Sequence, residues 1–316
     1  MLARIAQELY WLGRSLARAE FTARVVDGVF RVELQGQPEQ GAPGVVLGWN
    51  ELLAMFGSGE AGRGLLRLEA LHRLTLDAET PNSMASNVER ARAAARNVRD
   101  VISADMWEAI NTTALTLRGD TSGAWQGPTG PYLACKYVKE RTALIGGLTD
   151  RTMLRDEAQL FLSAGSYIET ADMVLRMLRV AFPPGGDASA GGHALALLHA
   201  VGGFQAYRRA VPAPPNARPV ARFLLFERAY PDSVAASVDS LHDALETADT
   251  SPRNSDPVLR LSRLAADLDF QRRTLSDDAE IGSTCEAVQV ELARVDADIA
   301  EHYFAGAVLG SATTAV

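Results

Sequence analysis

Two segments of this chain, 152 positions apart, carry the same helical pattern. The first contains GRSLARAEFTAR from Gly13, and the second contains GSYIETADMVLR from Gly165. Six aligned positions are identical: Leu2/Leu154, Ala6/Ala158, Gln7/Gln159, Gly13/Gly165, Ala19/Ala171 and Arg24/Arg176. Because each segment sets polar residues at the same phase of an apolar stripe, the pattern predicts two related long helices. The alternative is that two amphipathic helices coincide by composition.

Helical periodicity continues through most of the chain, and hardly any segment alternates polar and apolar residues as a strand does. We therefore predict an all-α bundle of long helices that forms a single domain over residues 1–304. Its two weakly related halves, about 1–118 and 131–304, are joined by a Gly/Pro loop at 119–131. Residues 305–316 are predicted to form a disordered tail.

Within the second half, the sequence predicts where the second repeat helix begins and ends. Gly146-Gly147 is expected to end the preceding helix, and Thr149 or Asp150 to cap the next one. That helix then runs to about Phe182, because Pro183-Pro184-Gly185-Gly186 follows.

Composition narrows the function classes. A formal net charge of −8 and a pI near 5.3 argue against a general nucleic-acid binder, which needs a basic surface. No apolar run approaches the length of a membrane helix, and Cys135 and Cys285 have neither zinc-ligand nor disulfide-framework spacing. We expect a cytoplasmic protein without a membrane segment, and oligomerisation stays open.

Polar residues on the two repeat helices are the first candidates for a site. Glu169 and Asp172 lie three apart on one helical face, and Arg18 and Glu20 occupy the corresponding phase of the first helix. Glu157 falls on the apolar stripe, where a carboxylate needs a cationic partner. If the helices pack antiparallel or as pseudo-symmetric mates, these groups converge. Otherwise they form solvated faces.

A stripe of arginines is the second candidate. Arg92, Arg96 and Arg99 follow i, i+4, i+7 spacing, which suits carboxylates or phosphates because guanidinium groups bind both bidentately. Pairing with nearby acidic residues of another helix explains the same stripe equally well. The predicted binding residues are Arg14, Arg18, Glu20, Arg24, Arg92, Arg96, Arg99 and Asp172, and Glu157 and Glu169 are the catalytic candidates.

Metal and nucleotide motifs give no support for a cofactor. Glu69 with His72, and Asp239 with His242, have spacings like those of carboxylate-bridged di-metal bundles, but such spacings are common by chance in helices. No GxGxxG, Walker A, HExxH or nucleophile-elbow motif occurs. We predict no metal and no cofactor.

The same residues resemble the bacterial alpha-E family, a helical domain named for a recurrent Glu-Arg pair. The opening MLARIAQELYWLGRSLARAEFTAR is similar to the family's opening along its length. Further similarities lie at 91–100, 106–111, 152–157, 169–173 and 231–234. The chain departs from the family pattern at Ala17 and Thr170, so the first pair keeps only Arg18 and the second only Glu169. Ala93-Ala94 replaces a polar Glu-Asn.

The resemblance implies an association with circularly permuted ATP-grasp proteins and with transglutaminase-like peptidases. It therefore favours an accessory subunit of an amide- or peptide-bond-forming system, in which Arg18, Arg92, Arg96, Glu157 and Glu169 line a polar cleft. The alternatives are a stand-alone enzyme with Glu157 or Glu169 as general base and arginines as anion clamps, and a non-catalytic oligomerisation module.

Overall fold

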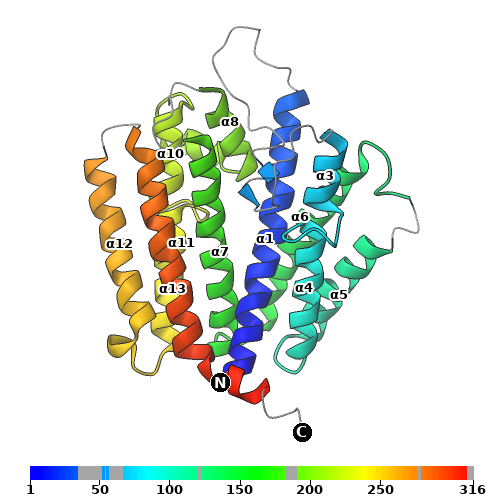
Figure 1. Ribbon diagram of the computed structural model, residues 1–316, viewed down its shortest axis with the longest axis vertical. Helices are drawn as coiled ribbons and strands as arrows, with labels where there is room; N and C mark the ends of the chain where they lie inside the picture. The colour runs from blue at the N-terminus through cyan, green and yellow to red at the C-terminus, as the bar shows by residue number, and fades with distance from the viewer. Residues whose placement is uncertain are drawn as a thin grey trace.

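The computed structural model describes residues 1–34, 52–53, 55–56, 67–119, 123–182, 191–275 and 279–311. These residues contain twelve α-helices, a short 3-10 turn at Pro252–Asn254 and no strand, which confirms the predicted all-α class (Figure 1). Within these ranges, no helix combines the length and the apolar composition that crossing a bilayer requires.

Helix α1 (Ala3–Leu34) and helix α7 (Glu157–Ala181) lie side by side at the centre and run in the same direction (Figure 1). Their contact depends on the two glycines that the repeat aligns. A Cβ on Gly13 would lie 2.0 Å from the carbonyl oxygen of Leu162, and a Cβ on Gly165 would lie 2.0 Å from that of Tyr10. Only glycine lets two backbones approach this closely, so the sequence repeat corresponds to a close helix crossing.

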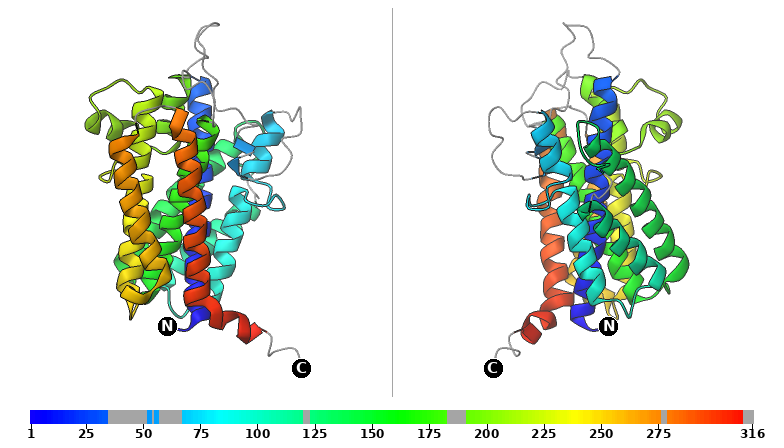
Figure 2. Two further views of the ribbon diagram at one scale, coloured as in Figure 1. Left: turned by 60° about the vertical axis from the view of Figure 1, so that its left-hand side comes forward. Right: turned by 90° about the vertical axis from the view of Figure 1, so that its right-hand side faces the viewer.

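Each central helix carries its own flank of helices. On α1 lie α3 (Arg67–Thr75), α4 (Met84–Asn97) and α6 (Gly130–Thr152), with α5 (Ala104–Arg118) packed between α4 and α6. On α7 lie α10 (Ala217–Phe226), α11 (Val234–Ala248) and α13 (Ala279–Ser311), with α12 (Asp256–Thr274) between α11 and α13. Helix α8 (Gly191–Ala200) packs on α1 and α10, and α9 (Phe204–Ala210) on α8. Helix α13 also packs on α1 and covers the seam between the central helices (Figure 2).

The two flanks correspond helix by helix. Helices α7, α10, α11, α12 and α13 each begin about 150 residues after α1, α3, α4, α5 and α6. Helices α4 and α11 begin in the same way, because Ser83 and Ser233 each follow a Pro-x pair and accept a hydrogen bond from the backbone N–H three residues on. The bundle is therefore a pseudo-two-fold pair of helix sets about the α1–α7 seam.

Two helix ends differ from the sequence-based prediction. Helix α6 continues through Gly146 and Gly147 to Thr152, because both glycines lie on the exposed side, where no close backbone contact interrupts the helix. Helix α7 is capped by Asp156, whose carboxylate accepts from the N–H groups of Ala158 and Gln159. The Gly/Pro loop as the border between halves stays a prediction, but the match of α6 with α13 favours a border after α6.

The C-terminal end also differs. Helix α13 continues to Ser311, into the segment for which the sequence predicts disorder, since Ala305–Leu309 contains no proline to stop it. Residues 312–316 of that predicted tail lie outside the described residues.

Candidate functional site

A buried carboxylate lies between two arginines at the α1–α7 seam. The side chain of Glu169 is 1% exposed, Nε of Arg14 donates to its Oε2 at 3.0 Å, and Nε of Arg18 donates to its Oε1. Both oxygens of the carboxylate therefore bind a guanidinium group from the neighbouring helix. Arg14 and Arg18 lie one turn apart on α1, so one face of α1 presents both to the same residue of α7.

Helix α13 closes one side of this ion pair. Asp296 accepts from Nη1 of Arg14 at 2.7 Å and from the hydroxyl of Tyr10 at 2.6 Å. Burial alone lowers the pKa of Arg14, but the carboxylates of Glu169 and Asp296 beside it outweigh this effect and raise that pKa. The guanidinium also lies over the ring of the half-exposed Trp11, 4.8 Å from its centroid.

A second carboxylate of α7 links the network to the surface. Asp172 accepts from Nε of Arg176 at 2.7 Å and from the amide of Gln289 on α13 at 2.7 Å, and it lies 3.8 Å from Nη2 of Arg18. On the other side, Nη1 of Arg18 donates to the side-chain oxygen of Asn82 at 3.0 Å. The same oxygen also accepts a hydrogen bond from Arg90 at 3.3 Å. Arg18 thus joins α1 and α7 to the start of α4.

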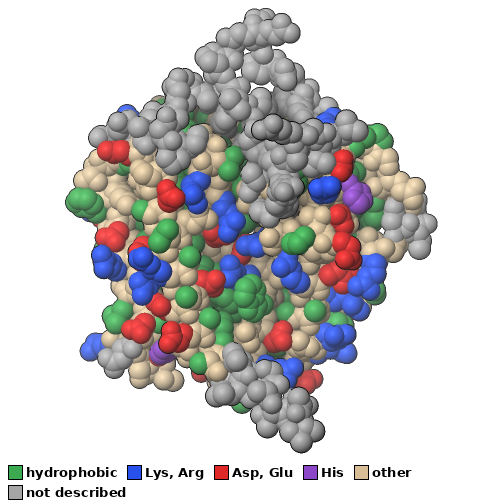
Figure 3. Space-filling view, in the orientation of Figure 1, with side chains coloured by type: hydrophobic (Ala, Val, Ile, Leu, Met, Phe, Trp, Pro, Cys, Tyr) green, Lys and Arg blue, Asp and Glu red, His purple; other side chains and the backbone are tan. Residues whose placement is uncertain are grey.

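We call this network the charged face: Arg14, Arg18, Asn82, Arg90, Glu169, Asp172, Arg176 and Asp296. Basic and acidic side chains gather across the middle of the molecule over α13, α1 and α4 (Figure 3). Four arginines stand against three carboxylates, so the charged face has a formal charge of +1 in a protein of net charge −8. Burial and the charge of Arg18 lower the pKa of Arg90, as expected for a cation beside a second one.

The remaining residues of α1 predicted to bind lie in a different network. Glu20 is 200° around the helix from Arg18, and it pairs with Arg24 at 2.5 Å. Arg24 also donates to Asp232, in the loop before α11, at 2.7 Å. Lys139 of α6 donates to Asp27 at 2.6 Å. We call Glu20, Arg24, Asp27, Lys139 and Asp232 the second cluster.

The sequence predicts that Arg92, Arg96 and Arg99 line a binding site, but they belong to neither network. Nε of Arg92 donates to Asn111 of α5 at 2.8 Å, and the guanidinium of Arg99 lies over the ring of Trp107 at 4.8 Å. Arg96 is exposed. Arg92 on α4 and Arg99, two residues past its end, therefore contact the neighbouring helix α5, so the proposed joint cleft with Glu169 is not formed. Arg90, outside the stripe, is the arginine of α4 that reaches the charged face.

Glu157 also lies apart from the other candidates. Its carboxylate accepts from the amino group of Met1 at 2.6 Å, and its side chain is 45% exposed. It stands twelve residues before Glu169 on α7, roughly 18 Å along the helix axis. The two catalytic candidates therefore cannot act on one small substrate.

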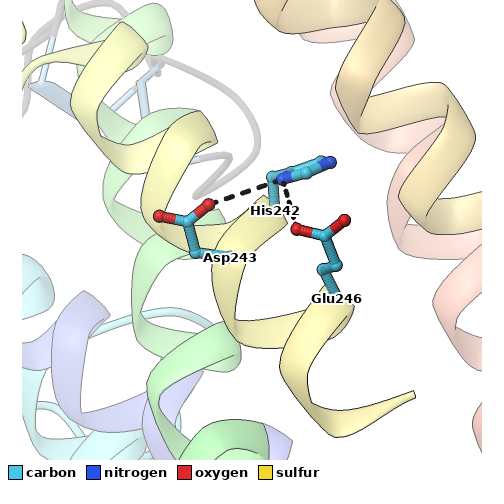
Figure 4. Close-up of side chains that lie close together, drawn as sticks. All are labelled: His242, Asp243 and Glu246. Atoms are coloured by element: carbon cyan, nitrogen blue, oxygen red, sulfur yellow. Dashed lines mark ion pairs between the residues drawn. The ribbon is translucent and has the colours of Figure 1, made fainter. Parts of the chain in front are cut away.

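The residues with di-metal spacing do not converge. Glu69 pairs with Arg73, Asp239 with Arg228, and Glu169 with its two arginines. In the described residues, His242, Asp243 and Glu246 bring three ligand atoms within 4.8 Å of one another (Figure 4). All three lie on one turn of α11, with Asp243 80% exposed, and the other ring nitrogen of His242 bonds to Ser262 at 2.8 Å. We assign no metal there.

Sequence reasoning did not identify Asp296, Gln289, Tyr10 and Asn82 as site residues. Asp296 and Gln289 are on α13. The sequence around them contains no motif, and nothing in it indicates that this helix covers the α1–α7 seam. Asn82 had a usable signal. It occupies the position that Asp232 occupies in the second Pro-x-Ser motif, and both contact an arginine of α1.

Comparison with known proteins agrees with this architecture. The model of the Alpha-E family, described as a predicted alpha-helical domain with a conserved ER motif, matches residues 1–304. No curated protein and no solved structure gives a significant match. Arg18 and Glu169 are bonded to each other in the centre of the bundle. With a match over nearly its whole length, this chain belongs to the Alpha-E family.

Proposed function

We propose that this chain is a non-catalytic, cytoplasmic accessory subunit of an ATP-grasp-type amide- or peptide-bond-forming system. Its partner in this proposal is a circularly permuted ATP-grasp protein, with a transglutaminase-like protein as a further component. The charged face is the surface that binds the substrate or the partner. The observation that carries the proposal is the excess of positive charge where Arg18 and Arg90 meet around Asn82.

The chemistry of the charged face suits an anion. Arg18 and Arg90 converge on one amide oxygen, and an incoming carboxylate or phosphate would relieve the repulsion between their charges. ATP-grasp chemistry passes through a carboxylate and an acyl phosphate, and both are oxyanions that guanidinium groups bind bidentately. Helices α1, α4, α7 and α13 hold the arginines in place, so little ordering is needed on binding.

The same geometry argues against Glu169 as a general base. Each oxygen of its carboxylate already accepts a hydrogen bond from a guanidinium group, and the side chain is buried. A base must be within hydrogen-bond reach of the proton that it removes. Glu169 therefore supports the positions of Arg14 and Arg18, and the chemistry is left to the partner.

A pull-down tests this function. A circularly permuted ATP-grasp protein from the same organism is tagged and co-expressed with wild type, Arg90→Ala or Arg96→Ala. We expect wild type and Arg96→Ala to co-purify with the tagged protein, and Arg90→Ala to lose most of the complex. Arg96 is a matched control because it is an exposed arginine of the same helix, on a different side from Arg90. The complex should also weaken as salt is raised.

A ligation assay completes the test. ATP-dependent formation of an amide product, followed by mass spectrometry, should require the partner and should be stimulated by this chain. If no complex forms and Arg90→Ala has no effect on ligation, the accessory function is wrong. If the chain alone forms product, it is an enzyme.

A further inference from the structure

A cavity of about 680 Å³ opens at the second cluster, on a different side of α1 from the charged face. Helix α1 supplies Arg24 and Asp27, α6 supplies Lys139, and the loop before α11 supplies Asp232. The α8 end and the start of α9 complete the wall with Leu198, Val201 and Phe204. The volume lies within the range of small-molecule sites, and the lining combines an apolar wall with a few convergent charges.

The charges of the second cluster are paired and carry an excess of one carboxylate. Arg24 joins Asp232 at 2.7 Å and Glu20 at 2.5 Å, and Lys139 joins Asp27 at 2.6 Å. Two cations thus stand against three carboxylates. Burial raises the pKa of Glu20, with a further increase from Asp232 that Arg24 opposes. Both cations are already paired with carboxylates, and one negative charge is left over. This cavity therefore does not attract a simple anion, unlike the charged face, which has a formal charge of +1.

The pseudo-two-fold relation supports a binding role for this position. The pair Glu20–Arg24 on α1 corresponds to Asp172–Arg176 on α7, and both are i,i+4 ion pairs. Asp232 corresponds to Asn82, because each stands directly before the serine that caps the following helix. The second cluster therefore occupies the place that the charged face occupies on the other side of the seam. It lacks a counterpart of the Glu169–Arg18 pair, because Ala17 and Thr170 stand at the equivalent positions.

We propose that this cavity binds a free α-amino acid with an apolar side chain. The ligand's ammonium group pairs with Asp27 and Asp232, and its carboxylate with Arg24 and Lys139, so a zwitterion satisfies both kinds of charge at once. The surplus carboxylate of Glu20 favours the ammonium end. The side chain lies against Leu198, Val201 and Phe204. Binding is a property of the isolated chain, so this inference does not depend on an ATP-grasp partner.

Titration calorimetry on the purified full chain tests the proposal with L-leucine as the probe. Two derivatives separate the charges: N-acetyl-L-leucine lacks the ammonium group, and L-leucine amide lacks the carboxylate. We expect L-leucine to bind and each derivative to bind at least about tenfold more weakly, because each derivative lacks one of the two charged groups that pair with the partly buried charges of the cavity. L-leucine should also raise the Tm by about 2 °C at ten times its Kd.

Variants locate the site. Asp232→Asn and Asp27→Asn should each weaken L-leucine binding at least about tenfold, while Lys136→Ala should leave it unchanged. Lys136 lies on α6 three residues before Lys139 and is 72% exposed. Circular dichroism shows that each variant is folded before its affinity is compared. Absence of binding, equal binding of N-acetyl-L-leucine, or an unaffected affinity in both folded aspartate variants would each overturn the proposal.

Discussion

Arg18 of α1 and Glu169 of α7, 151 residues apart in sequence, form an ion pair across the central seam of the bundle. On the opposite helix, Thr170 stands at the position equivalent to Arg18, and Ala17 at the position equivalent to Glu169. The pseudo-two-fold axis explains this pattern. It relates the Arg18–Glu169 contact to the position of Thr170 and Ala17, so the seam has two equivalent positions, and an Arg–Glu pair occupies one of them.

Replacing Glu169 removes the anion between two arginines. We expect Glu169→Gln to lower the free energy of unfolding by about 3 kcal/mol, because breaking a buried pair leaves uncompensated charge. Urea denaturation measures the change. Glu286→Gln, at a side chain that is 53% exposed, is the control and should change stability by less than about 0.5 kcal/mol. A similar small loss for both would mean that the buried pair contributes little.

The glycines at the helix crossing are expected to tolerate no side chain. Gly13→Ala and Gly165→Ala each place a Cβ 2.0 Å from a carbonyl oxygen of the opposite helix, so the helices must separate. A loss of about 3 kcal/mol or more is expected. Gly147→Ala is the matched control. It lies in helix α6 with nothing within 4 Å of the added Cβ, and it should stabilise by about 0.5–1 kcal/mol. Thermal unfolding distinguishes the opposite signs.

A second Glu–Arg contact across the seam can be built at Ala17 and Thr170. If the pseudo-two-fold relation holds at side-chain level, Ala17→Glu with Thr170→Arg builds the counterpart of the Glu169–Arg18 contact. A double-mutant cycle by urea denaturation should give a favourable coupling of about 1 kcal/mol or more between the two changes. Purely additive effects would contradict the crosswise arrangement.

Acid dependence of stability reports on Glu20. Its pKa is raised chiefly by burial, and Arg24 offsets part of this effect. The folded state therefore takes up the proton at a higher pH than the unfolded chain does. The stability from this uptake is present below the unfolded value of 4.5 and is lost as pH rises from there through the folded pKa. Glutamine stays neutral at every pH. The free energy of unfolding of Glu20→Gln should therefore exceed that of wild type by an amount that grows as pH rises from 4.5 through the folded pKa and is constant at higher pH. Urea midpoints across the window measure this difference.

Much of the fold follows from local rules that the sequence contains. The 3.6-residue period of residues 2–30 predicts α1, and the absence of two-residue alternation agrees with the lack of strands in the described residues. Helix ends are harder to predict. Helix propensity predicts that α6 ends at Gly146 and Gly147, but the helix passes through them to Thr152. The cap of α7 is Asp156, and not Thr149 or Asp150 as the sequence predicts.

The sequence by itself determined the helices, the repeat and the phase of Arg18 and Glu169 on their own helices. Only the tertiary structure decided that these two residues meet, that Asp296 of α13 joins them, and that Glu157, Arg92, Arg96 and Arg99 lie elsewhere. The physical reason is that helical phase fixes the direction of a side chain relative to its own axis. Which helix lies in that direction depends on packing, here on the parallel contact that Gly13 and Gly165 permit.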